Sequence, residues 1–140
     1  MELTTTVEMR GRFFDGTARR RLTRAVSEAV RDLTSEAETF LNDRLRPQSG
    51  GGVYKNIGVA EGGSTGNYRR NISTHMRQLN ALISDGGVIY GPWLEGISSR
   101  NATTRFKGYS SFRRAAQFAQ EKSNRVFRAY ISTYVRNVNG

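Results

Sequence analysis

The side chains that most often carry out catalysis are scarce in this sequence. His75 is the only histidine among 140 residues, and cysteine is absent, so the sequence does not support a nucleophile–histidine pair or a thiolate metal site. Glu95 is the only acid between Asp85 and Glu121, whereas general acid–base catalysis needs titratable groups close together. His75 lies in an alternating stretch, where an ordinary strand residue is expected. The sequence therefore predicts no enzyme activity, no cofactor and no metal ion.

Two glycine-rich segments, near 48–52 and 61–67, lack the context of a phosphate-binding loop. Such a loop follows a strand, carries a lysine and opens a helix, and neither segment shows this pattern. Both segments are predicted to be flexible connections.

Arginine dominates the charge of the chain. The sequence has 22 Lys+Arg against 12 Asp+Glu, which gives a net charge of +10. Arginine forms multidentate pairs with phosphate and carboxylate groups, so a field of this sign favours polyanions or acidic protein surfaces. The candidate contacts for DNA or an acidic partner are Arg19, Arg20, Arg21, Arg69 and Arg70. The sequence lacks zinc-knuckle ligands and a helix-turn-helix signature, and a genomic bias toward arginine is the alternative cause of the excess.

The segment from Ile89 to Tyr109 places aromatic residues, glycines and cations together without an amphipathic period. It contains the only tryptophan, Trp93. Irregular connections lie on the surface and carry function more often than regular elements do, so this segment is predicted to contact a partner. The candidate interface residues are Tyr90, Trp93, Glu95, Arg100, Arg105, Phe106, Tyr109 and Arg113. The alternatives are a core position for Trp93, a local helix-turn or salt-bridge role for Glu95, and solvated side chains for Arg105 and Arg113.

Hydrophobic periodicity predicts the elements that position these residues. Alternation from Leu3 to Met9 predicts a strand that runs to about Arg12, and apolar residues at helical spacing predict a long helix from about Thr17 to Pro47. A short strand is predicted at 53–59, and strands at 68–77 and 81–84, joined by a turn at 78–80, are predicted to form an antiparallel hairpin. A helical turn is predicted within 88–95, with Pro92 near its start. A second long helix is predicted to begin at a cap formed by Ser110 or Ser111 and to run nearly to the C-terminus.

This order of elements predicts one α+β domain over residues 1–140, in which two long helices cover one face of a small, mainly antiparallel sheet. No apolar run approaches the roughly 20 residues that a membrane-spanning helix needs, and the N-terminus lacks the features of a secretory signal. The sequence therefore predicts synthesis in a cytoplasm and no membrane partner.

Four motifs in a fixed order resemble a known family. They are Leu45-Arg46-Pro47-Gln48-Ser49-Gly50, Asn67-Tyr68-Arg69-Arg70-Asn71-Ile72, Tyr90-Gly91-Pro92-Trp93-Leu94-Glu95-Gly96 and Arg105-Phe106-Lys107-Gly108-Tyr109. The order is similar, over most of the chain, to that of the tail-completion, or neck, proteins of long-tailed double-stranded DNA bacteriophages. The chain departs from the family between Arg105 and Ala115, where the family often has Pro-Phe-Leu-Arg-Pro-Ala.

The resemblance implies a structural role in the virion. Subunits would form a homo-oligomeric ring, a hexamer by analogy, at the head-to-tail junction. This ring would join the capsid connector or stopper to the tail tube, and genomic double-stranded DNA would pass through its lumen. A tail terminator ring that caps the tail tube is the alternative within this class, and a basic nucleic-acid-binding module is the alternative from another class. A ring subunit must offer a patch and a different, complementary patch, and Trp93 with its aromatic neighbours is the expected anchor of such a contact.

Overall fold

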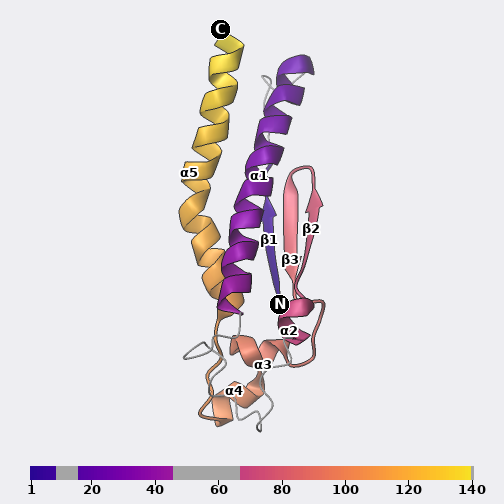
Figure 1. Ribbon diagram of the computed structural model, residues 1–140, viewed down its shortest axis with the longest axis vertical. Helices are drawn as coiled ribbons and strands as arrows, with labels where there is room; N and C mark the ends of the chain where they lie inside the picture. Colours follow the sequence, from indigo (N-terminus) through magenta and orange to yellow (C-terminus); the bar gives the residue numbers. More distant parts are fainter. Residues whose placement is uncertain (9–15, 46–66, 140) are drawn as a thin grey trace.

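The computed structural model describes residues 1–8, 16–45 and 67–139 (Figure 1). The elements, in chain order, are β1 (Glu2–Thr6), α1 (Gly16–Arg44), α2 (Asn67–Arg70), β2 (Ser73–Arg77), β3 (Asn80–Ser84), α3 (Gly91–Glu95), α4 (Ser99–Thr103) and α5 (Ser111–Asn139). A small antiparallel sheet packs against two long helices, so the predicted α+β class is confirmed.

The sheet has the order β1-β3-β2, and both pairings are antiparallel. In the register, Thr4 lies opposite Leu82, and Leu82 lies opposite His75. Alternate residues of β3, Ala81 and Ile83, are buried against the helices, while Thr4 and His75 are exposed on the other face. An antiparallel sheet commonly leaves one face to water. The predicted antiparallel hairpin is confirmed as β2 and β3.

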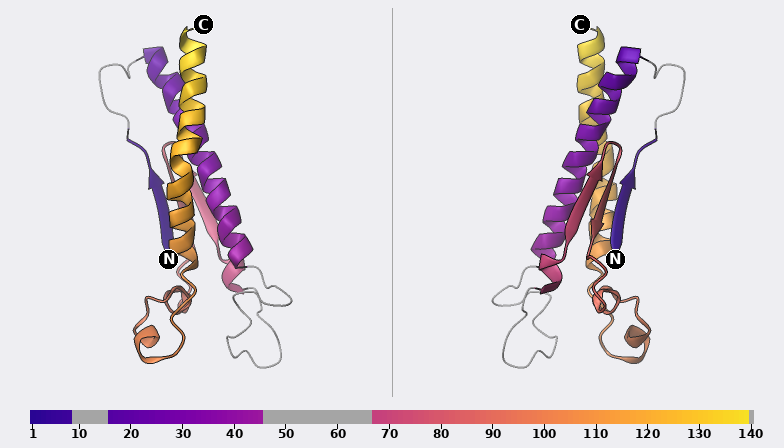
Figure 2. Two further views of the ribbon diagram at one scale, coloured as in Figure 1. Left: turned by 90° about the vertical axis from the view of Figure 1, so that its left-hand side faces the viewer. Right: turned by 90° about the vertical axis from the view of Figure 1, so that its right-hand side faces the viewer.

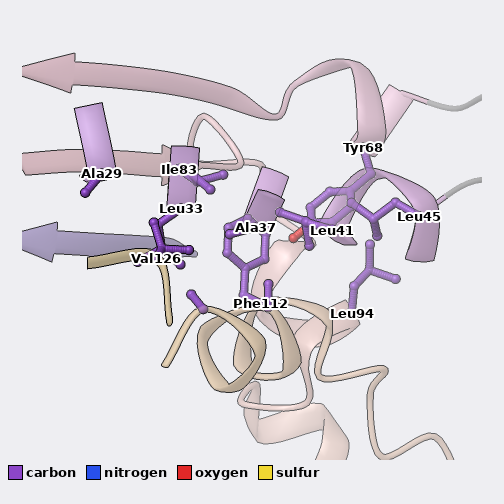
Figure 3. Packing of buried hydrophobic residues seen from close by; sticks show 12 residues of the cluster. Ala29, Leu33, Ala37, Leu41, Leu45, Tyr68, Ile83, Leu94, Phe112 and Val126 are labelled. Atoms are coloured by element: carbon purple, nitrogen blue, oxygen red, sulfur yellow. The ribbon is translucent and has the colours of Figure 1, made fainter. Parts of the chain in front are cut away.

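The two long helices run antiparallel and side by side, and both pack against the sheet, α1 on β3 and α5 on β1 (Figures 1 and 2). Their buried side chains recur at helical spacing, as in Leu33, Ala37 and Leu41 of α1. Figure 3 shows Tyr68 of α2 and Leu94 of α3 beside the last buried residues of α1. The main core is therefore continuous from the sheet to the lower end of α1, and the periodic pattern predicted both helices correctly.

The strand predicted over 68–77 is wrong in its first half. Residues Asn67–Arg70 form one helical turn, and only Ser73–Arg77 are extended. The turn carries Tyr68 into the core, where its ring is 7% exposed and its hydroxyl donates a hydrogen bond to Asp85 Oδ2 at 3.2 Å. This tertiary contact overrides the strand propensity of the local sequence.

Several predictions fall outside the described residues. These are the continuation of the first strand through 9–12, the strand at 53–59, the connection at 48–52 and nearly all of the connection at 61–67. The helical turn near Pro92 is confirmed as α3, and α4 is a helix that the sequence did not predict. Among the described helices, none combines the length and the apolar character needed to cross a bilayer.

Candidate protein-interaction site

Residues 88–110, which join β3 to α5, fold into a compact unit that we call the loop module. It contains α3 and α4 and lies at the end of the molecule where α1 ends and α5 begins (Figures 1 and 2). Pro92 stands in the first turn of α3, a position that suits its fixed φ and missing N–H. The helix ends at Gly96, whose φ of 95° is left-handed and whose N–H donates to the carbonyl oxygen of Pro92.

Asn101 ties together three parts of the loop module. Its side-chain nitrogen donates to the carbonyl oxygens of Trp93 at 3.0 Å and Phe106 at 3.1 Å, and its Oδ1 accepts the N–H of Ser98 at 2.9 Å. Asn101 is 5% exposed. Because a buried amide that lost these partners would leave several polar groups unsatisfied, Asn101 fixes the path of the loop. The Ser98–Asn101 capping box also starts α4.

Two glycines let the loop module close on itself. The φ angles of Gly96 and Gly108 are +95° and +87°, and a Cβ added to Gly108 would lie 2.3 Å from the Cα of Gly96. A Cβ on Gly96 would lie 2.2 Å from the carbonyl oxygen of Lys107. Next to this contact, the N–H of Tyr109 donates to the carbonyl oxygen of Leu94 at 2.7 Å. Only glycine satisfies both the backbone angle and the close approach.

Three aromatic residues that were predicted to form an interface pack mainly on one another. The ring centroids of Trp93 and Phe106 are 4.5 Å apart, and those of Phe106 and Tyr109 are 4.9 Å apart. Trp93 and Tyr109 are half-buried against the main core, and burial raises the pKa of Tyr109. These side chains therefore hold the loop module together, as in the alternative that placed Trp93 in a core.

Glu95 is inside the protomer, so its prediction as a surface contact is wrong. It is 2% exposed, and its carboxylate oxygens accept the N–H groups of Phe112 at 3.0 Å and Arg113 at 2.9 Å. These N–H groups belong to the first turn of α5, which has no intrahelical acceptor for them and carries the positive end of the helix dipole. Glu95 thus replaces the predicted serine cap, and the Ser110 hydroxyl donates instead to the carbonyl oxygen of Glu95.

Asp85, directly after β3, joins this end of the sheet to α2 and to the first residue of the chain. It is 0% exposed, and its carboxylate accepts the Tyr68 hydroxyl and the N–H of Gly87. The α-ammonium group of Met1 also donates to it at 2.7 Å. A Cβ on Gly91 would lie 2.1 Å from Asp85 Oδ2, so the start of α3 needs glycine beside this carboxylate.

The loop module exposes an apolar patch, defined as Ile89, Tyr90 and Ile97. Their side chains flank α3 and are 97%, 42% and 53% exposed. Tyr90 is held in place because its hydroxyl accepts a hydrogen bond from the Asn67 side chain at 3.0 Å. Contiguous exposed apolar surface marks protein contacts, whereas single exposed apolar side chains are common. Tyr90 is among the predicted interface residues and the two isoleucines are not, although both lie in the segment without an apolar period.

Three of the predicted arginines of the loop segment, Arg100, Arg105 and Arg113, are exposed. The first two belong to the loop module itself, and the third lies in the first turn of α5. Surface arginines around an apolar patch are common at the rim of protein interfaces.

The five arginines predicted to contact DNA do not form one surface. Arg19 and Arg20 line a groove between α1 and the β2–β3 turn, together with Arg24 and Arg31. Arg21 faces another groove, between α1 and the C-terminal half of α5. Arg69 and Arg70 lie in α2, at the opposite end of α1 (Figure 1). A single partner can therefore contact both Arg19–Arg21 and Arg69–Arg70 only if it extends along α1; a short partner can contact only one of these groups.

The geometry defines an α+β domain with a rigid, apolar and cationic loop module at one end. Within residues 1–8, 16–45 and 67–139, no group of three His, Asp or Glu side chains has the arrangement of a metal site. His75 is exposed on β2. Comparison of the chain with protein-family models, with curated proteins and with solved structures found no significant match.

Proposed function

We propose that this chain is a virion structural protein of a tailed bacteriophage and that it forms a ring at the head-to-tail junction. The ring would join the capsid connector or stopper to the tail tube and let double-stranded DNA pass through its lumen. The proposal assigns the protein to the virion and gives it no catalytic role.

The observation that carries the proposal is the loop module. Its backbone is fixed by buried polar groups, namely Asn101 and Glu95, whereas the side chains of Ile89 and Ile97 are exposed. A rigid support under exposed apolar side chains is the arrangement expected of a permanent protein contact, because little conformational entropy is lost on binding. The same segment carries two of the motifs that resemble those of neck proteins.

Electron cryo-microscopy of purified particles from the phage that encodes this chain tests the proposal. The expected result is a closed ring of this protein between the portal and the tail tube. A ring directly on the last tube layer, present also on tails without heads, would assign the protein to the tail terminator. If purified particles lack the chain, the structural proposal is wrong.

A basic nucleic-acid-binding module is the second candidate, and the groove lined by Arg19, Arg20, Arg24 and Arg31 favours it. Ser27 and Thr23 hydroxyls line the same groove, and such groups contact phosphates in many complexes. Binding of a labelled duplex in a salt series tests this candidate. Each phosphate contact adds about −0.9 to the slope of log affinity against log salt, so a slope near −3 or steeper is expected. If the duplex does not bind at low salt, this candidate is wrong.

A further inference from the structure

The start of α1 and the C-terminal half of α5 lie side by side at the end of the molecule away from the loop module (Figures 1 and 2). Residues 16–31 and 126–137 together contain seven arginines and one acid, Glu28, which gives a net charge of +6. Among the described residues, Arg24 is the only one of these arginines in a salt bridge, and its partner is Glu28. We call this part of the helix pair the basic end, and it carries most of the excess positive charge of the chain.

A groove of about 620 Å³ lies between the two helices at the basic end, and we call it the helix groove. Its volume lies in the range of about 300–1,000 Å³ that is typical of binding pockets. Apolar groups and cations both line it: Ala25, Ala129, Tyr130 and Tyr134 supply the apolar surface, and Arg21 and Arg24 supply the cations.

The two tyrosine hydroxyls of the helix groove are engaged within the protomer. The Tyr130 hydroxyl donates to Asp32, and the Tyr134 hydroxyl donates to the carbonyl oxygen of Ala18 at 3.2 Å. The tyrosine rings, together with the alanine side chains, therefore give the groove a mainly apolar floor. Nucleic-acid backbones are bound through hydrogen-bond donors, so this floor favours apolar side chains of a protein over a phosphate backbone.

The walls of the helix groove suit a third helix. Ala25 of α1 and Ala129 of α5 are small, so a helix that lies between them can approach both walls closely. Amphipathic helices commonly place their apolar face in an apolar groove of a partner. The polar face of such a helix would meet the arginines of the basic end, which form multidentate pairs with carboxylates.

We propose that the helix groove binds an acidic amphipathic helix of another protein. The apolar face of that helix would lie on Ala25 and Ala129, and its carboxylates would pair with Arg21 and the other arginines of the basic end. A second copy of this chain is a poor occupant, because its apolar patch belongs to a module that exposes Arg100 and Arg105, and like charges across a contact oppose binding. The inference does not rest on the proposed function, since it concerns the opposite end of the molecule.

Three designed peptides test the proposal. Two have the same apolar residues at helical spacing, and their polar face carries glutamate in one and lysine in the other. The third has the composition of the glutamate peptide in a scrambled order without an apolar face. Fluorescence anisotropy of each labelled peptide with the full-length protein measures the affinity. We expect the glutamate peptide to bind at least about tenfold more tightly than either of the others.

A matched pair of variants locates the binding site. Ala129→Glu places a carboxylate at an exposed position of the helix groove and should weaken binding of the glutamate peptide at least about tenfold by like-charge repulsion. Ser132→Glu makes the same change of charge at an exposed residue of α5 that is not among the lining residues, and it should weaken binding much less. Neither should lower the melting temperature. If Ala129→Glu does, Thr133→Glu, at another exposed lining residue, replaces it.

The outcomes separate the possible occupants of the helix groove. Equal affinities for the glutamate peptide and its scrambled form, or equal losses in the two variants, would overturn the proposal, because binding would then follow only the general field of the basic end. A labelled DNA duplex that binds more tightly than the glutamate peptide, and that Ala129→Glu weakens more than Ser132→Glu, would assign the groove to nucleic acid instead. Self-association of the protein that Ala129→Glu abolishes would assign the groove to a second copy.

Discussion

The paired helices and the loop module are stabilised by different kinds of contact. α1 and α5 are held together by many interchangeable apolar side chains, such as Leu33, Leu41 and Val126. The loop module is held by a few atoms in fixed places, namely the Asn101 amide, the Glu95 carboxylate and the contact between Gly96 and Gly108. Burial of apolar area is non-directional, whereas hydrogen bonds and close backbone contacts require particular groups.

The difference explains where an interaction surface can be built. The paired helices bury most of their apolar stripe, and among the described side chains of α5 only Ile131 and Val135 are large apolar residues that stay exposed. The loop module uses polar atoms and glycines for its own folding, so Ile89 and Ile97 remain available at the surface. If this comparison is right, truncation of a buried side chain in the paired helices should lower the free energy of unfolding most, and substitutions in the loop module should lower it less.

The largest effect is expected from Leu41→Ala in the core of α1. Leu41 is 0% exposed, and truncating a buried leucine leaves a cavity, so the free energy of unfolding should fall by about 4 kcal/mol. Urea denaturation followed by circular dichroism measures this loss. Val135→Ala in α5 is the control, because Val135 is 45% exposed; a comparable loss in the control would contradict the assigned core.

Gly108→Ala should have the next largest effect. The added Cβ would meet the backbone of Gly96, and its φ of +87° disfavours any side chain, so the free energy of unfolding should fall by about 3 kcal/mol. Gly87→Ala is a matched control, since Gly87 also has positive φ, at +72°, but has nothing within 4 Å of the added Cβ. Equal losses in the two variants would mean that the close approach contributes nothing.

Glu95→Gln should destabilise the domain by about 2 kcal/mol, because it removes the charge from a buried, hydrogen-bonded cap. The effect should be local as well. Amide hydrogen exchange of Phe112 and Arg113, whose N–H groups contact Glu95, should accelerate more than exchange in the middle of α5. Glu121→Gln on the exposed side of α5 should leave stability and exchange unchanged, and unchanged exchange at Phe112 in Glu95→Gln would rule out the cap.

The smallest effect concerns Tyr130, whose hydroxyl donates to Asp32 across the two long helices. This hydrogen bond raises the pKa of Tyr130 to about 12, with smaller contributions from burial and from the charges of Asp32 and Glu28. A raised pKa in the folded state adds stability that is complete below the ordinary tyrosine pKa near 10 and is lost as the pH rises toward 12.

Tyr130→Phe should therefore be less stable than the unmodified protein at neutral pH, by under about 1 kcal/mol at this exposed position. The difference in free energy of unfolding between the two proteins should shrink between pH 9 and pH 11.5. Urea titrations at each pH measure it. A difference that stays constant over this range would show that the Tyr130–Asp32 bond does not persist in solution.

The sequence was sufficient for the elements that depend on a repeating pattern. Apolar spacing predicted α1 and α5, alternation with turn residues predicted the hairpin, and Pro92 marked the start of α3. It was insufficient at α2, because Tyr68 turns toward Asp85, a residue 17 positions away. Nothing in the local sequence around Tyr68 reports that contact.

In the candidate site, too, the sequence indicates the local pattern but not the contacts between residues far apart in the chain. The segment 89–109 has no amphipathic period, but it contains the helix α4, which the sequence did not predict, and the roles of its residues depend on contacts between its two halves. The Glu95 carboxylate accepts a hydrogen bond from the N–H of Phe112, 17 positions later in the chain. The rings of Trp93 and Phe106 come into contact only when the loop closes. Exposure of Ile89 and Ile97 is likewise a property of the folded module, because aliphatic residues are more often buried.

We propose that the loop module joins this chain to its neighbours in a phage particle, whereas the paired helices hold the fold together. The double variant Ile89→Glu/Ile97→Glu tests it most directly, when its melting temperature and its amount in purified phage particles are measured together. We expect an unchanged melting temperature and loss of the protein from the particles. A particle content equal to that of the unmodified protein, or a melting temperature that falls as far as that of Leu41→Ala, would contradict it.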